Sequence, residues 1–141
     1  MSAVLKRGNM RDESKETHAA LEAWARWAKS YLSGLGYSPV NMIARFMEYG
    51  PLLAGGFGPI PVEIDQTCEI VDRAIGRLDQ TQQEVVYRTY LENDAAQVTA
   101  GKCGLTYGYY REVLKDARRR VGDYINGAKY AVVSPTKLRV V

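Results

Sequence analysis

The residues whose types and spacing suggest chemistry lie in the last third of the chain, and they are cationic and aromatic. Four of them recur at i, i+4, i+8 and i+11: Tyr107, Arg111, Lys115 and Arg118. On a helix this spacing places the four side chains along one face, with Arg119 beside them and no acidic residue among them. Arginine and lysine at such positions bind phosphates, and an arginine fork matches the acceptor edge of guanine. The pattern predicts a helix that reads duplex DNA.

Each residue around this face has an expected role. We expect Arg111 to contact guanine, and the flanking Lys and Arg residues to contact phosphates. Tyr107 and Tyr109 offer hydroxyl groups to phosphate or apolar contact to thymine methyl groups. Thr106 precedes the helix and can cap it. The predicted DNA-binding residues are Thr106, Tyr107, Tyr109, Arg111, Lys115, Arg118 and Arg119.

Catalytic and metal-binding side chains are sparse. Cys68 and Cys103 form no CxxC pair, and His18 is the single histidine, so the spacing fits no tetrahedral zinc site. A nucleophilic cysteine needs a nearby base, and His18 is the one imidazole on offer. The sequence predicts no enzyme activity, no cofactor and no metal. We expect the cysteines to be small core residues and His18 to lie on the surface.

The charges are distributed unevenly along the chain. The formal net charge is +3 over 141 residues. Residues 61–100 carry three basic and eight acidic groups, whereas residues 101–141 carry nine basic and three acidic groups. A basic end of this kind indicates a polyanionic partner. The absence of a long apolar stretch or an apolar segment near the start predicts a cytoplasmic protein that does not enter a membrane.

The elements that must position these residues are predicted to be helices, because apolar residues recur with helical period and nothing alternates long enough to require a sheet. Glycine, proline and capping residues divide the helices. We expect helices over 17–32, 40–49, 63–78, 80–91, 95–103 and 107–127, with N-caps at Thr17 or Ser14, Asp79, Asp94 and Thr106. The fold class is therefore all-α, a small helical domain.

The same pattern gives the domain organisation. Residues 1–16 are polar and without period and predict a flexible N-terminus. Residues 17–127 form a single helical domain, made of N-terminal helices and a Gly/Pro linker (17–62) and a helix-turn-helix part (63–127). Residues 128–141 are expected to form a C-terminal tail.

Two further groups of side chains carry expectations. Trp24, Trp27 and Tyr31 form an aromatic stripe, which favours core packing against the helix over 40–49 and leaves contact with a partner as the alternative. The acidic residues of the middle segment are expected to form a solvated face: Glu63, Asp65, Glu69, Asp72 and Asp79.

The segment from Val71 resembles a known DNA-binding unit. The run VDRAIGRL (71–78), then QQEVV (82–86), YRTY (87–90), GLT (104–106), Arg111 and Ala117-Arg118 resembles the C-terminal helix-turn-helix of sigma factors, their region 4. Asp116 departs from the Arg-Ala-Arg end of that pattern. The resemblance implies that the helix beginning at Tyr107 enters the DNA major groove.

A second resemblance lies nearer the N-terminus. LEAWARWA (21–28) followed by GYSP (36–39), a linker and a sigma-like helix-turn-helix is similar to the zinc-free late antitermination proteins, the Q proteins, of lambdoid phages. This resemblance implies a phage protein of the bacterial host's cytoplasm that binds a DNA element at the late promoter. It also implies loading onto paused host RNA polymerase, sigma factor included, and read-through of terminators in late gene expression.

Two alternatives remain beside antitermination. The first is a phage transcription activator that uses the same helix-turn-helix to recruit polymerase without affecting termination. The second is a protein-binding module whose basic helix docks on an acidic surface. Because one helix-turn-helix covers only a few base pairs, we also expect either a second copy of the chain on the DNA or help from polymerase.

Overall fold

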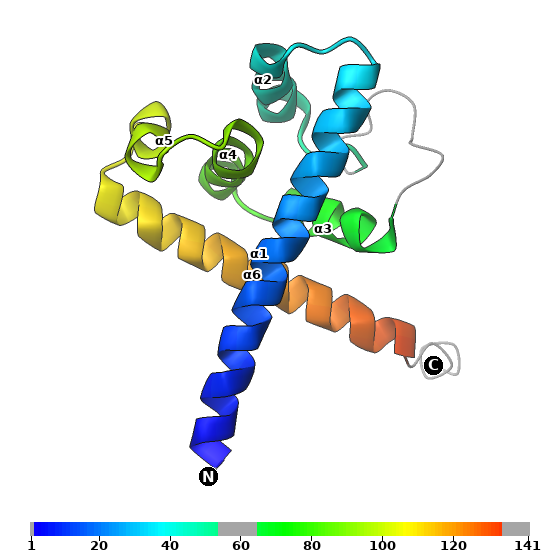
Figure 1. The fold of residues 1–141 in the computed structure, drawn as a ribbon, viewed down its shortest axis with the longest axis vertical. Helices are drawn as coiled ribbons and strands as arrows, with labels where there is room; N and C mark the ends of the chain where they lie inside the picture. The colour runs from blue at the N-terminus through cyan, green and yellow to red at the C-terminus, as the bar shows by residue number, and fades with distance from the viewer. Residues whose placement is uncertain (1, 54–64, 134–141) are drawn as a thin grey trace.

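The structure, a computed structural model, describes residues 2–53 and 65–133, and every regular element in these ranges is helical (Figure 1). The expected all-α class is confirmed. None of the helices in these ranges is long and apolar enough to cross a membrane. The elements are α1 (Ser2–Gly34), α2 (Pro39–Tyr49), α3 (Gln66–Gly76), α4 (Gln80–Tyr87), the π-helix η1 (Arg88–Glu92), α5 (Ala96–Lys102) and α6 (Tyr107–Val133).

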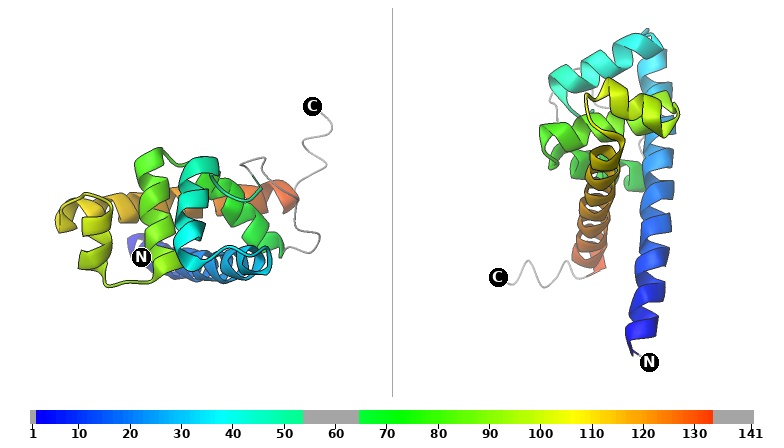
Figure 2. Two further views of the ribbon diagram at one scale, coloured as in Figure 1. Left: turned by 90° about the horizontal axis from the view of Figure 1, so that it is seen from above. Right: turned by 90° about the vertical axis from the view of Figure 1, so that its left-hand side faces the viewer.

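The two long helices, α1 and α6, cross near their middles (Figure 1). The crossing is close because α6 has a glycine there: a Cβ on Gly122 would lie 2.7 Å from Oγ1 of the buried Thr17. Figure 2 shows that α1 and α6 lie in separate layers and that the short helices gather around the C-terminal half of α1. The crossing therefore fixes the frame into which α2–α5 pack.

The core lies where α1 meets the short helices. Trp24 of α1 is fully buried, with its ring centroid 5.5 Å from that of Phe46 in α2 and 6.3 Å from that of Tyr87 in α4. Phe46 and Tyr87 stack at 4.8 Å. Offset aromatic packing at these separations stabilises a core beyond the area that it buries. The expected core role is confirmed for Trp24, whereas Trp27 is half-buried and stacks on Tyr31 at 6.2 Å.

Asp72 of α3 corrects one expectation, because it is fully buried rather than part of a solvated acidic face. Its carboxylate accepts hydrogen bonds from the Trp24 indole (3.0 Å) and from the backbone N–H groups of Leu52 (3.0 Å) and Leu53 (2.7 Å). Burial raises the pKa of Asp72, while these three donors oppose that shift. The physical reason is the helix wheel: Asp72 lies four residues after buried Cys68 and belongs to the apolar stripe.

Several helix starts follow the capping residues in the sequence. Asp79 and Gln82 form a reciprocal capping box at α4, with Asp79 Oδ1 accepting from the Gln82 backbone N–H at 2.8 Å. Thr106 Oγ1 accepts from the Tyr109 backbone N–H at 3.3 Å at the start of α6. Both caps confirm the prediction. Asp94, by contrast, does not cap α5, whose N-cap is Ala95 without a side-chain hydrogen bond.

Two helices are longer than expected. The structure has α1 helical from Ser2, so residues 2–16 are helical rather than irregular, and Thr17 lies within the helix instead of capping it. Residues such as Ala, Leu, Lys, Arg, Met and Glu favour helix even where no apolar period is visible, and the first sixteen residues are rich in them. Likewise α6 continues past Gly127 to Val133, into the segment expected to be a tail.

Other boundaries shift modestly. The helix expected over 63–78 spans Gln66–Gly76, and the helix expected over 80–91 is α through Tyr87 and then π over η1. Most of the Gly/Pro linker (residues 54–64, with Glu63) and the end of the tail (134–141) lie outside the described residues.

Candidate nucleic-acid interface

The junction between α5 and α6 is a tight four-residue turn. Gly104 adopts φ +71°, a left-handed conformation that glycine tolerates best. Leu105 N–H donates to Ala100 O, and Gly104 N–H donates to Gly101 O, both at 3.0 Å. These two bonds form a Schellman motif that ends α5 and directs the chain into α6. The turn therefore sets the angle at which the first residues of α6 leave α5.

The first two turns of α6 present the predicted side chains to solvent. Tyr107 is 42% exposed and Tyr109 57% exposed, and Thr106, Arg111 and Lys115 are exposed as well. The Arg111 guanidinium lies 5.7 Å from the Tyr107 ring centroid, a cation–π contact that leaves its hydrogen-bond donors free of any carboxylate in the described residues. The opposite face of α6 packs into the core through Tyr110, Val113, Leu114, Ala117 and Val121.

Arg118 lies on the predicted face but is half-buried and already engaged inside the molecule. Its Nε donates to the Tyr90 hydroxyl at 2.8 Å, and its Nη2 lies 3.4 Å from His18 Nδ1. His18 Nδ1 is also 2.8 Å from the Tyr90 hydroxyl. His18 is therefore not a plain surface residue near a helix start, because it joins α1 to η1 and α6.

Arg119 does not share the acid-free face. Its guanidinium pairs with Asp116, and with Asp123 at 3.4 Å. Asp116 also pairs with Arg120 at 3.3 Å and accepts a hydrogen bond from the Gln82 side-chain Nε2 at 2.7 Å. It therefore connects α6 to α4. The hydrogen bond from Arg119 lowers the pKa of Asp116, which keeps the carboxylate charged. The acid that departs from the sigma-like pattern thus has a structural role, and it draws Arg119 to the side of α6.

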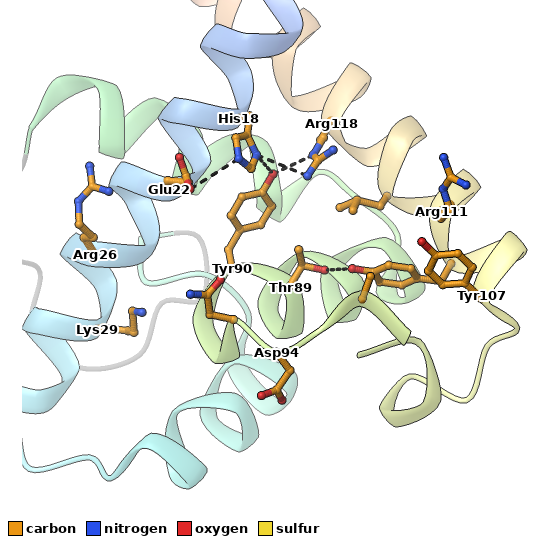
Figure 3. Close-up of a pocket in the computed structure, with 14 residues that line it drawn as sticks. His18, Glu22, Arg26, Lys29, Thr89, Tyr90, Asp94, Tyr107, Arg111 and Arg118 are labelled. Atoms are coloured by element: carbon orange, nitrogen blue, oxygen red, sulfur yellow. Dashed lines mark hydrogen bonds and ion pairs between the residues drawn. The ribbon is translucent and has the colours of Figure 1, made fainter. Parts of the chain in front are cut away.

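A cleft of about 390 Å³ lies between α1, η1 and the start of α6 (Figure 3). Its floor contains Thr89 and Tyr90, and the Thr89 hydroxyl is 2.7 Å from that of Tyr110. The walls carry charged side chains from both long helices. These are His18, Glu22, Arg26 and Lys29 from α1, and Arg111 and Arg118 from α6.

Sequence reasoning placed Tyr107, Arg111 and Arg118 on one face but missed the residues that α1 contributes to this cleft. A signal was present, since His18, Glu22, Arg26 and Lys29 follow one another at i, i+4, i+8 and i+11. This is the same spacing as on α6. The sequence pattern did not reveal that α1 and α6 cross, and it is this crossing that places both faces along one cleft.

Neither cysteine lines this cleft. Cys68 is buried, and burial raises the pKa of its thiol. Burial likewise raises the pKa of half-buried Cys103 to about 11, with a further contribution from Glu84. Both thiols are therefore protonated at neutral pH and pack as small apolar groups. Within the described ranges, no three His, Cys, Asp or Glu side chains come together in a way that could hold a metal ion.

Comparisons of the chain with protein-family models, with curated proteins and with solved structures found no match.

Proposed function

We propose that the chain is a phage late-gene transcription antiterminator that binds duplex DNA through α6. In this proposal the protein recognises a DNA element at the late promoter, loads onto promoter-proximally paused RNA polymerase and makes the enzyme read through terminators. The observation that carries the DNA-binding part is the α5–turn–α6 arrangement, with an exposed basic and aromatic face on the first turns of α6.

The chemistry of that face supports a reading helix. The N-terminal amides of a helix favour an anion, and side chains in the first turns can reach base edges while later cations contact phosphates. Arg111 and Lys115 are exposed and one turn apart, so the first can reach a base edge while the second contacts a phosphate. Arg118 can join them only by leaving Tyr90, so we place it at the edge of the interface. Arg119 is the weakest member of the predicted set because two carboxylates surround it.

The step from DNA binding to antitermination comes from the resemblance of residues 21–39 and 71–118 to the Q proteins and to sigma region 4. It implies host RNA polymerase as the second partner, with sigma factor present at the pause. A second copy of the chain would enlarge the DNA contact.

Transcription in vitro tests the proposal. The template carries the late promoter and a downstream terminator, and it is compared with one in which the DNA element is scrambled. An antiterminator raises the fraction of transcripts that pass the terminator, and does so only on the intact template. Higher initiation with unchanged termination would instead identify an activator. A chain without sequence-dependent DNA binding would contradict both functions and leave a protein-binding module.

A further inference from the structure

The cleft beside α6 is built from two matching rows of side chains. On α1, residues 18, 22, 26 and 29 face it, and on α6 it is lined by residues 107, 111, 114 and 118 (Figure 3). The rows meet at His18 and Arg118, close to the helix crossing, and separate from there. At 1.5 Å rise per residue, Lys29 lies about 16 Å along α1 from His18, and Tyr107 about 16 Å along α6 from Arg118. The cleft is therefore narrow at the crossing and open at the far ends.

The charges of the cleft are not balanced. Of its two carboxylates, Asp94 binds Lys102 at 2.8 Å. Glu22 lies 3.6 Å from His18 Nε2, which is an ion pair only when the imidazole is protonated. Arg118 is engaged by Tyr90. Arg26, Lys29 and Arg111 have no carboxylate within ion-pair distance in the part of the chain that is described. Three unpaired cations thus surround the open end, two of them from α1.

From this arrangement we propose that α1 forms part of the DNA interface, with Arg26 and Lys29 binding phosphates beside the groove that α6 enters. This inference rests on the proposed DNA binding by α6 and extends it to a second helix. The two cations are one helical turn apart and so can bind neighbouring phosphates of one strand. The major groove is about 12 Å wide, so a helix next to the reading helix is within reach of the flanking backbone.

The aromatic residues of the cleft favour a duplex backbone over a single strand as the occupant. Single strands bind by stacking bases on exposed rings. Tyr90 and Tyr110 are 6% and 2% exposed, and their hydroxyls are hydrogen-bonded to other side chains. Tyr107 is the exposed ring of the cleft, and Arg111 lies beside it. A single exposed ring cannot stack several successive bases, whereas the cations can bind the phosphates of a duplex.

Salt dependence of duplex binding tests the inference. The double variant R26Q/K29Q removes two charges, and because each phosphate contact contributes about −0.9 to the slope of log K against log salt, the slope should become shallower by about 1.8. The ratio of affinities for specific and scrambled duplex should stay unchanged, since phosphates carry no sequence information. The matched control is R73Q/R77Q, which removes two exposed charges, one in the last turn of α3 and one at its C-cap, from a part of the molecule that does not line the cleft.

The outcomes separate the two proposals. If the wild-type protein binds specific duplex with a steep slope and R26Q/K29Q has the same slope as the control, the role of α1 is wrong while DNA binding by α6 stands. Should the wild-type protein show no salt-dependent binding, both proposals fail. A double variant that loses affinity for single strands and keeps its duplex slope would also overturn the role of α1.

A second measurement uses the wild-type protein, so it does not depend on the folding of a variant. Specific duplex should slow acylation of the Lys29 amine several-fold, whereas Lys15, exposed on α1 and outside the cleft, should react at an unchanged rate. Equal rates at Lys29 with and without duplex would contradict the proposed contact.

Discussion

At the scale of single residues, Arg111 and Lys115 should behave differently although both are exposed cations of α6. Arg111→Ala should weaken binding to the specific site by about 1 to 3 kcal/mol and relax the preference at one base pair, because its fork reads a base edge. Lys115→Ala should weaken all duplexes alike. Affinities for the specific duplex and its single-base variants, measured at one salt concentration, distinguish the two effects. If neither substitution changes binding, α6 is not the reading helix.

Asp72 is a second residue whose contribution can be measured. Asp72→Asn places an NH₂ group among three N–H donors, so at least one donor loses its acceptor. We expect the free energy of unfolding to fall by about 1 to 3 kcal/mol. Glu69→Gln on the same helix is the control and should change it by less than about 0.5 kcal/mol, because its ion pair with Arg73 is exposed. Urea unfolding measures both, and equal effects would contradict the buried role of Asp72.

The raised pKa of Asp72 also predicts a pH dependence. Between the unfolded value of about 3.9 and the higher folded value, the native state binds a proton that the unfolded state has released. The proton-linked part of the stability contributed by Asp72 is therefore complete below the unfolded pKa and is lost as pH rises through the folded pKa, whereas its three hydrogen bonds remain. The Asp72→Asn variant should lack this part of the pH profile, which urea titrations above pH 4 can resolve.

Tyr87 differs from Asp72 because its buried polar group lacks a hydrogen-bond partner among the described residues. Its side chain is fully buried and its hydroxyl has no hydrogen-bond partner in the described structure, and burial raises its pKa. Tyr87→Phe removes an unsatisfied polar group without changing the ring, so stability should stay constant or increase by up to about 2 kcal/mol. A marked loss in thermal or urea unfolding would show that the hydroxyl does have a partner.

At the scale of elements, the contact between α1 and α6 depends on one glycine. Gly122→Ala would bring a methyl group to 2.7 Å from Thr17 Oγ1, so we expect overpacking to destabilise the protein by about 1 to 3 kcal/mol despite alanine's better helix propensity. Gly127→Ala is the matched control on the same helix. Nothing lies within 4 Å of its added Cβ, so it should stabilise by up to about 1 kcal/mol.

A substitution of Thr17 tests the same helix contact from the side of α1. Because the nearest atom to the added methyl is Thr17 Oγ1, the double variant T17A/G122A should recover part of the stability lost in G122A. Thermal unfolding of the four proteins measures the coupling. Strict additivity of the two substitutions would show that the helices do not touch there.

The elements also show what local sequence can and cannot predict. Helix starts at Asp79 and Thr106 followed from capping residues, because a cap is a contact between neighbours in the chain. The start of α1, the π-turn at η1 and the failure of Asp94 as a cap did not follow. Asp94 had a competing partner eight residues away, Lys102. The cleft itself was unpredictable since its two walls are about ninety residues apart and meet only through the crossing.

At the scale of the whole molecule, one continuous core connects all the helices from α1 to α6. We therefore expect unfolding to be a single cooperative transition. Helix loss measured by circular dichroism and exposure of Trp24 and Trp27 measured by fluorescence should have coincident midpoints in urea. An earlier fluorescence midpoint would mean that α1 leaves the other helices before they unfold.

The contact of Arg118 with Tyr90 and His18 has a consequence for affinity. A phosphate that captures the Arg118 guanidinium must take it from the Tyr90 hydroxyl, so the two acceptors compete for one donor. The free energy of the internal contact is then subtracted from the affinity for DNA, and by reciprocity bound DNA loosens the attachment of α1 to η1. Binding of DNA would thereby change how firmly α1 is held, and this change would extend to surfaces of α1 that do not contact the nucleic acid.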